Sequence, residues 1–210
     1  MTETRMRHQA AIADVVQGWA LWRDSCQWDL LRGCFAPGAL IRTTWFDGTA
    51  ADFVEASIRL AAHGSPVQHL VGAPVIEWAG PDGDGYGSDS RDRAVAETRV
   101  ELLVRTMLDG VPVDVQCYGR FHDRFVRHEG AWKIAFRSPV YDKDRLQPVD
   151  PAATVRLDPA RLAALPAHYA HLAYVQSAGG ATITMDIPAA NTPAYQALHE
   201  ASRQWLREAA

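Results

Sequence analysis

Apolar and polar side chains alternate through the middle of this 210-residue chain, from Ala94 to Tyr141. A period of two sustained over so many residues is hard to obtain from a helix and predicts extended strands. Asp109-Gly110 and Glu129-Gly130 divide the segment, and both pairs are typical of tight hairpin turns. We therefore expect three consecutive antiparallel strands, the third of which begins at Ala131.

Helical patterns precede these strands. Apolar residues at helical spacing predict a helix from Glu3 to Asp24, and a short second helix is expected from Trp28 to Phe35. A strand is then predicted from Leu40 to Phe46, and Thr49 is a candidate N-cap for a third helix. Val67 to Trp78 has the pattern of one further strand. Three helices followed by a curved meander predict an α+β cone that forms a pocket.

The C-terminal part of the chain differs in character. We expect a cone domain over residues 1–146 and an extension over residues 147–210. Within the extension, residues 181–187 (ATITMDI) alternate as a strand would, between short helices. So small a segment cannot bury a core of its own, so it is expected to pack on the cone or on a neighbouring subunit. Its expected anchors are Tyr169, Leu172, Val175 and Trp205.

Composition narrows the range of partners. The net charge of −4 gives no indication of a nucleic-acid partner. No apolar run approaches the ~20 residues that cross a membrane, so no membrane partner is expected. The cysteines are odd in number and widely spaced, at Cys26, Cys34 and Cys117, which favours reduced thiols and a cytoplasmic location.

Two stretches of the sequence carry a family resemblance. Residues 119–137 read GRFHDRFVRHEGAWKIAFR, and residues 20–41 read ALWRDSCQWDLLRGCFAPGALI. The first resembles the closing strands, and the second the opening helices and first strand, of the SnoaL-like branch of the nuclear transport factor 2-like superfamily. The resemblance spans about Ala10 to Leu146. It implies a cystatin-like α+β barrel, a fold that hosts enzymes, binding domains and assembly modules alike.

The same resemblance implies a catalytic group. Asp24 and His69 stand in register with the Asp-His dyad of the scytalone dehydratase, hexachlorocyclohexane dehydrochlorinase and bile-acid dehydratase group. In that group the aspartate holds the imidazole while the histidine removes a proton during β-elimination. Arg137 falls where those enzymes carry an arginine near the leaving group or carbonyl. The resemblance therefore implies Asp24, His69 and Arg137 as catalytic residues.

Each of these residues also has a purely structural interpretation. Asp24 alone would be a surface residue at the end of a helix, and His69 alone would be a core histidine with satisfied hydrogen bonds. Arg137 could pair with Glu97 or Glu101 across the sheet. These alternatives stay open at the level of the sequence.

Trp19 departs from the group's pattern. It stands where the active eliminases carry tyrosine or lysine, and an indole can donate a hydrogen bond but cannot act as an acid or base. This exchange favours an apolar pocket for an aromatic or polycyclic ligand. Trp19, Trp45 and Tyr118 are the predicted substrate-binding residues, whereas Phe121 is better explained by ordinary core packing.

We therefore expect a cofactor-independent lyase or isomerase that acts on a small hydrophobic molecule, in a homodimer or homotrimer. The alternatives are a non-catalytic protein that binds a hydrophobic ligand and a structural subunit resembling the small subunit of aromatic-ring dioxygenases. No metal site is expected, because His168 and His171 lack an evident third ligand. His122 and His128, on a strand and its turn, are expected to be solvated.

Overall fold

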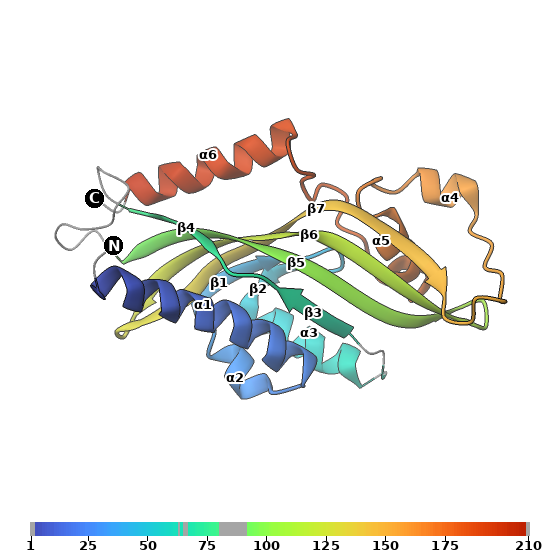
Figure 1. Cartoon of the computed structure of the whole chain (residues 1–210), viewed down its shortest axis with the longest axis horizontal. Helices are drawn as coiled ribbons and strands as arrows, with labels where there is room; N and C mark the ends of the chain where they lie inside the picture. Colours follow the sequence, from blue (N-terminus) through green and yellow to red (C-terminus); the bar gives the residue numbers. More distant parts are fainter. Residues whose placement is uncertain (1–2, 63, 65–66, 80–91, 209–210) are drawn as a thin grey trace.

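A computed structural model describes residues 3–62, 64, 67–79 and 92–208 of the chain. Figure 1 shows a long, curved sheet with helices on both sides, α6 on one side and α1, α2 and α3 on the other. Seven strands form this unclosed sheet in the order β2-β1-β7-β6-β5-β3, with β4 also paired to β5. The fold is therefore the mixed α+β cone that the sequence predicts. The sequence also predicts a loop rich in Gly, Asp and Ser over residues 80–92, and residues 80–91 of it lie outside the described residues.

The N-terminal helices follow the predicted order. They are α1 (Glu3–Asp24), α2 (Trp28–Arg32) and α3 (Ala50–Ala61). The predicted cap of α3 is confirmed, because the Thr49 side chain accepts a hydrogen bond from the Asp52 backbone N–H. The predicted end of the second helix at Phe35 is wrong, since Phe35 already pairs with Ile134 as the first residue of β1.

Strand β1 (Phe35–Arg42) begins earlier and ends earlier than expected. It lies parallel to β7, and its other edge pairs with the short antiparallel β2 (Asp47–Thr49). The predicted strand end at Phe46 instead forms a turn, in which the Thr43 backbone N–H donates to the Phe46 carbonyl at 2.7 Å.

The strand expected from Val67 to Trp78 is divided in two. These are β3 (Val67–Val71) and β4 (Val75–Trp78), and both pair antiparallel with β5. Pro74 lies between them. Because proline has no backbone N–H to donate to a neighbouring strand, the ladder is interrupted there.

The three long strands of the predicted meander are confirmed. They are β5 (Arg93–Leu108), β6 (Val111–His128) and β7 (Ala131–Pro148). Both hairpin turns have two residues with positive φ, 49° and 80° at Asp109-Gly110 and 51° and 80° at Glu129-Gly130. This is the geometry of the two-residue turn that matches the twist of antiparallel strands.

One face of β5 and β6 carries two hydrophobic cores in succession; we call it the inner face. Alternation along the strands places Ala96, Phe121 and His69 of β3 on this face, and Glu97 and His122 on the opposite, outer face. The first core lies beneath α1 and α3 and includes Phe121 and Phe125. The second lies farther along the strands and includes Val113, Val115 and Cys117.

The C-terminal extension packs on both faces of the sheet. It contains α4 (Pro159–Ala163), α5 (Ala170–Ala178) and α6 (Pro193–Arg207). Helix α5 covers the second core, where the predicted anchors Tyr169, Leu172 and Val175 are buried. Helix α6 lies on the outer face, where Trp205 is a partly buried neighbour of Val95.

The strand predicted at residues 181–187 is wrong. Its backbone has no regular pairing, although the Thr184 N–H donates to the Thr44 carbonyl at 2.9 Å. The Thr184 carbonyl in turn accepts from the Tyr169 hydroxyl at 2.6 Å, so single hydrogen bonds tie the segment down. None of the helices in the described ranges is long and apolar enough to cross a bilayer.

Candidate active site

Asp24 and His69 are joined by two hydrogen bonds. Asp24 is the last residue of α1, and His69 lies in the middle of β3. One carboxylate oxygen of Asp24 lies 2.6 Å from the His69 Nδ1 atom. The other accepts from the His69 backbone N–H, also at 2.6 Å. The two residues that the family resemblance pairs are thus in direct contact, with side chains only 17% and 11% exposed.

The surroundings of His69 keep its imidazole neutral. Burial lowers the pKa of His69 below the usual 6.5, and this effect outweighs the Asp24 carboxylate, which raises it. The nearby charges of Arg23 and Arg137 lower the pKa further. An ionised carboxylate beside Nδ1 favours the tautomer with a proton on Nδ1, because that N–H then has an acceptor. The lone pair of Nε2 is then available to take a proton.

Aromatic rings surround this pair. The Trp19 ring meets His69 edge-to-face at 5.1 Å between centroids, and it meets Phe121 in the same way at 5.2 Å. Phe53 stacks on Trp19 at 6.3 Å, and Trp45 packs on Phe53 at 5.6 Å. Trp19 therefore touches the histidine directly, whereas the ring contacts connect Trp45 to it through Phe53 and Trp19. That these rings line a ligand cavity remains a prediction.

Arg137 lies in the same aromatic shell. Its guanidinium carbon is 4.3 Å from the centroid of the Trp19 ring and 4.1 Å from that of Phe121. Two parallel hydrogen bonds of 2.7 Å connect its Nε and Nη2 atoms to the buried Asp123 carboxylate. Arg137 and Asp123 are direct cross-strand partners on β7 and β6. The alternative pairing with Glu97 or Glu101 is wrong, since both residues lie on the outer face of β5.

Two buried donors of this shell have no hydrogen-bond acceptor among the described residues. They are the indole Nε1 of Trp19 and the Nη1 of Arg137. Trp19 is 3% exposed and Arg137 is 1% exposed. Buried donors nearly always have an acceptor in native proteins. Two donors without one, both near His69, therefore indicate a place for a water or a ligand acceptor.

Tyr118 does not join this group. It alternates with Phe121 along β6 and lies on the outer face, opposite Lys143 across the β6–β7 pair. The Lys143 amino group is 5.7 Å from the Tyr118 ring centroid. Its predicted role in substrate binding therefore lacks support from its position.

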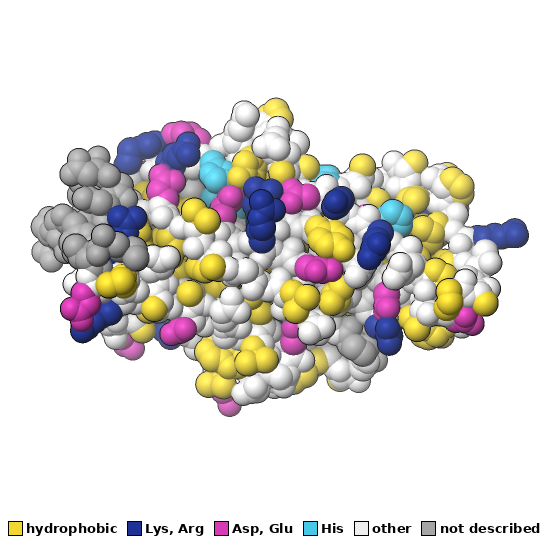
Figure 2. Space-filling model, viewed as in Figure 1, with side chains coloured by type: hydrophobic (Ala, Val, Ile, Leu, Met, Phe, Trp, Pro, Cys, Tyr) yellow, Lys and Arg dark blue, Asp and Glu magenta, His cyan; other side chains and the backbone are white. Residues whose placement is uncertain are grey.

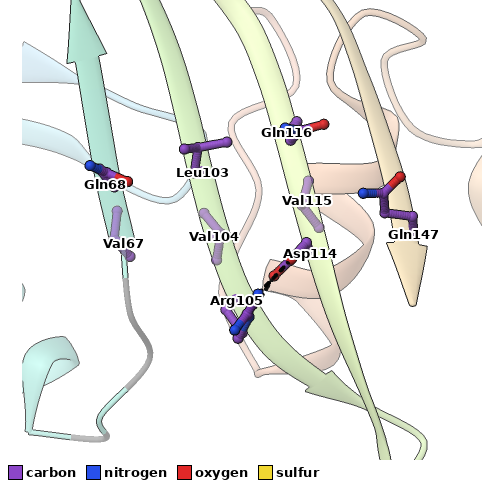
Figure 3. A pocket seen from close by; sticks show the side chains of 9 residues that line it. All are labelled: Val67, Gln68, Leu103, Val104, Arg105, Asp114, Val115, Gln116 and Gln147. Carbon is purple, nitrogen blue, oxygen red and sulfur yellow. Dashed lines mark hydrogen bonds and ion pairs between the residues drawn. The ribbon is translucent and has the colours of Figure 1, made fainter. Parts of the chain in front are cut away.

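A pocket of about 350 Å³ lies on the outer face and is separate from the dyad. Figure 3 shows that it spans neighbouring strands and contains the ion pair of Arg105 and Asp114, whose closest atoms are 2.8 Å apart. Gln68 and Leu103 are cross-strand partners at its wall, one residue from the inner-face pair of His69 and Leu102. This pocket offers no acid or base beyond an exposed ion pair. Its lining residues are Val67, Gln68, Leu103, Val104, Arg105, Asp114, Val115, Gln116 and Gln147.

The buried cysteines are unsuited to nucleophilic chemistry. Burial raises the pKa of Cys34 to about 12 and the pKa of Cys117 well above its usual value. Thiolates are the reactive form, and neither side chain forms one near neutral pH. All three cysteines are free thiols, as predicted, and Cys26 is exposed.

The expectation that His122 is solvated is wrong. Its side chain is fully buried beneath α6, where its Nε2 lies 2.7 Å from the Ser202 hydroxyl. Its Nδ1 faces Glu97. Alternation along β6 places His122 on the outer face, but only the docking of α6, 80 residues later, explains its burial. The sequence offers no local signal for that contact.

Comparison with known proteins agrees with this architecture. Pea pathogenicity protein 2 from Fusarium vanettenii is 29% identical over 204 residues, which span 93% of this chain and 84% of that protein. A putative scytalone dehydratase from Novosphingobium aromaticivorans superposes with a TM-score of 0.54 at 15% identity and covers 74% of this chain and 100% of its own. A type 2 hexachlorocyclohexane dehydrochlorinase (LinA) superposes with a TM-score of 0.52 at 16% identity, covering 74% and 95% of the two chains.

The two solved structures share the fold of the cone at low sequence identity. The family model of the SnoaL-like domain matches residues 4–138, which contain Asp24, His69 and Arg137. The matched region ends inside β7 and includes the whole of the first core. On this evidence the chain belongs to the SnoaL-like domain family.

Proposed function

We propose that this protein is a cofactor-independent lyase or isomerase that removes a proton from a carbon atom of a small hydrophobic substrate. The observation that carries the proposal is the Asp24–His69 pair, with both carboxylate oxygens fixed on one histidine at 2.6 Å. A neutral imidazole whose Nδ1 is held in this way has its Nε2 free to act as a general base. The solved neighbours described as dehydratase and dehydrochlorinase support an elimination reaction.

Arg137 and Trp19 supply the electrophilic side of the site. When a proton leaves the carbon beside a carbonyl group, negative charge develops on the carbonyl oxygen. The unpaired Nη1–H of Arg137 and the unpaired Nε1–H of Trp19 can both donate to that oxygen. Donors already fixed in a buried site stabilise such charge strongly, because no solvent has to reorganise. Trp19 thus contributes as a hydrogen-bond donor, although it cannot transfer a proton.

In the dehydration that we propose, His69 acts first as a base and then as an acid. Nε2 of His69 takes the proton from the carbon beside the carbonyl, and the C–H electron pair forms an enolate. The enolate then forms a carbon–carbon double bond as the C–O bond to a hydroxyl on the next carbon breaks. The departing oxygen takes the proton from the His69 imidazolium and leaves as water. An isomerisation would return the same proton to a different carbon.

The aromatic shell points to a planar hydrophobic substrate. Trp19, Phe53 and Phe121 offer ring faces and edges near His69. Offset-stacked and edge-to-face contacts with these rings favour an aromatic or polycyclic molecule over a sugar or a phosphate. The substrate class we propose is therefore a β-hydroxy ketone on a ring fused to an aromatic system.

An assay with a panel of such ketones tests this proposal. The conjugated product is followed by its ultraviolet absorbance, and the reaction is run in deuterium oxide to follow exchange at the carbon beside the carbonyl. We expect turnover by the wild type and a loss of about 10²–10⁴-fold in His69→Gln, the usual contribution of a general base. His171→Gln is the matched control, because His171 likewise contacts a carboxylate, that of Asp144, at 2.8 Å.

A second candidate, non-catalytic binding of a hydrophobic ligand, is favoured by one observation. Trp19 replaces a side chain that could transfer a proton with one that cannot, and its ring adds apolar surface beside His69. The same panel separates the two functions. Binding of the ketones without exchange or product would support the binding protein, and equal turnover by the wild type and His69→Gln would refute the enzyme.

A further inference from the structure

A second group of chemically active side chains lies on the outer face of the sheet, beneath α6. Glu97 and His122 are direct cross-strand partners on β5 and β6. His199 reaches them from α6, and one ligand atom from each of the three residues lies within 4.8 Å of the others. The dyad residue His69 lies on the inner face, so the two groups are separated by the sheet.

The spacing of these atoms suits a metal ion. The Nδ1 atom of His122 lies 3.3 Å from the Glu97 Oε1, and the Nε2 atom of His199 lies 2.8 Å from the same oxygen. Tetrahedral zinc, with bonds of 2.0–2.2 Å, holds neighbouring ligand atoms about 3.3–3.5 Å apart. Small rotations of the Glu97 and His199 side chains would bring all three atoms to that spacing.

We propose that Glu97, His122 and His199 bind a divalent transition-metal ion, and that this ion fastens α6 to the sheet. Two imidazoles and one carboxylate are a common ligand set for zinc. Calcium and magnesium prefer sites made of oxygen atoms alone, so this ligand set disfavours them.

Groups around the three ligands hold them in position. The hydroxyl of Ser202 lies 2.7 Å from the His122 Nε2 and accepts a hydrogen bond from the Arg124 Nε at 3.0 Å. Its oxygen can accept the Nε2–H of His122 as well, which leaves the Nδ1 lone pair of that residue for the metal. Metal-binding histidines are usually oriented in this way by a hydrogen bond to their other ring nitrogen.

The remaining neighbours contact the Oε2 atom of Glu97, whereas its Oε1 atom faces the two histidines. The Tyr195 hydroxyl donates to the Glu97 Oε2 at 3.1 Å, on the same side of α6 as His199. Arg120 places a positive charge 3.9 Å from the Glu97 Oε2, but its guanidinium is itself paired with Asp142. Figure 2 shows histidine side chains at the surface along α6, and His199 is 22% exposed, so an ion can enter from solvent.

The same contacts could also be a network of hydrogen bonds centred on the Glu97 carboxylate. Metal titration distinguishes a metal site from such a hydrogen-bond network. The full chain is treated with a chelator and dialysed, then titrated with zinc by calorimetry and with cobalt by visible absorption. We expect one ion per chain and the absorption of tetrahedral cobalt. His69→Gln should bind zinc as the wild type does, because the dyad lies on the other face.

Variants on α6 make the test specific. His199→Ala, at a partly exposed position, should fold and lose at least 100-fold in zinc affinity. Ser202→Ala should lose about 10–100-fold, as expected when the partner of a metal-binding histidine is removed. His171→Ala is the matched control and should bind zinc normally. Glu97→Gln, which keeps one acceptor oxygen, should bind more weakly too.

Two results would overturn the proposal. One is a wild-type protein that binds neither zinc nor cobalt, in which case the cluster is a hydrogen-bond network alone. The other is zinc binding that survives unchanged in His199→Ala, which would place the ion elsewhere.

Discussion

The carboxylate of Asp24 is hydrogen-bonded to both the side chain and the backbone of His69. Its Oδ1 lies 2.6 Å from the His69 Nδ1, and its Oδ2 lies 2.6 Å from the His69 backbone nitrogen. This arrangement fixes the ring of His69 relative to β3 as well as its tautomer. An amide at position 24 has one oxygen and one NH₂ group, so it can satisfy only one of these two donors correctly.

The first prediction concerns Asp24→Asn. For a ketone of the panel that the wild type converts, we expect turnover to fall by about 10²–10⁴-fold, because the Nδ1–H tautomer of His69 loses its acceptor. The free energy of unfolding, measured with urea, should fall by about 1.5–3 kcal/mol, the usual contribution of a hydrogen bond to a charged group. Asp29→Asn is the control, since the Asp29 side chain is fully exposed and should change neither quantity.

The sequence could identify this dyad because both residues stand in short stretches that resemble a known family. It could not identify the partner of Arg137, because the choice among Asp123, Glu97 and Glu101 depends on the register between β6 and β7. Alternation alone places Asp123 on the inner face with Phe121. A bulge in β7 between Ile134 and Phe136 then aligns Asp123 with Arg137.

Contacts made by the C-terminal extension were the least predictable. The apolar pattern of the extension predicts its anchor residues, but it does not specify which face of which strand they cover. The burial of His122 depends on Ser202 and His199, which lie on a helix about 80 residues away. Local periodicity carries no information about such long-range docking.

The second prediction concerns stability and pH. The pKa of His69 is lower in the folded chain than its usual 6.5, so the unfolded chain binds this proton more readily. The contribution of neutral His69 to stability is therefore complete above pH 6.5 and is lost as the pH falls towards the lowered pKa. We expect urea unfolding to show this loss in the wild type and a smaller loss in His69→Gln. An unchanged pH dependence in the variant would contradict the burial argument.

The third prediction separates the structural role of Arg137 from its chemical role. Arg137→Met leaves the Asp123 carboxylate buried without a partner, which should destabilise the chain by about 3–5 kcal/mol. The double variant Arg137→Met/Asp123→Leu removes both charges and should recover much of this loss in urea unfolding. Its turnover should remain low, because the donor to the substrate oxygen is missing. Recovery of turnover together with stability would show that Arg137 acts only through the fold.

The fourth prediction tests the docking of the extension on the cone. Leu172 of α5 is fully buried in the second core, so Leu172→Ala should destabilise the chain by about 2–5 kcal/mol. Leu21→Ala, at a side chain 63% exposed, is the control and should change stability little. Unfolding in two separate transitions, with the cone unaffected by Leu172→Ala, would show that the extension does not stabilise the cone.

The most direct test of the central claim is the protonation state of His69. Long-range ¹H–¹⁵N correlation spectra of the folded chain, assigned with His69→Gln, report which ring nitrogen carries the proton and at what pH the ring becomes charged. We predict a neutral ring at pH 7 with the proton on Nδ1, a pKa below 6.5, and loss of this tautomer preference in Asp24→Asn. An imidazolium at pH 7, or a neutral ring with its proton on Nε2, would contradict the assignment of His69 as the base.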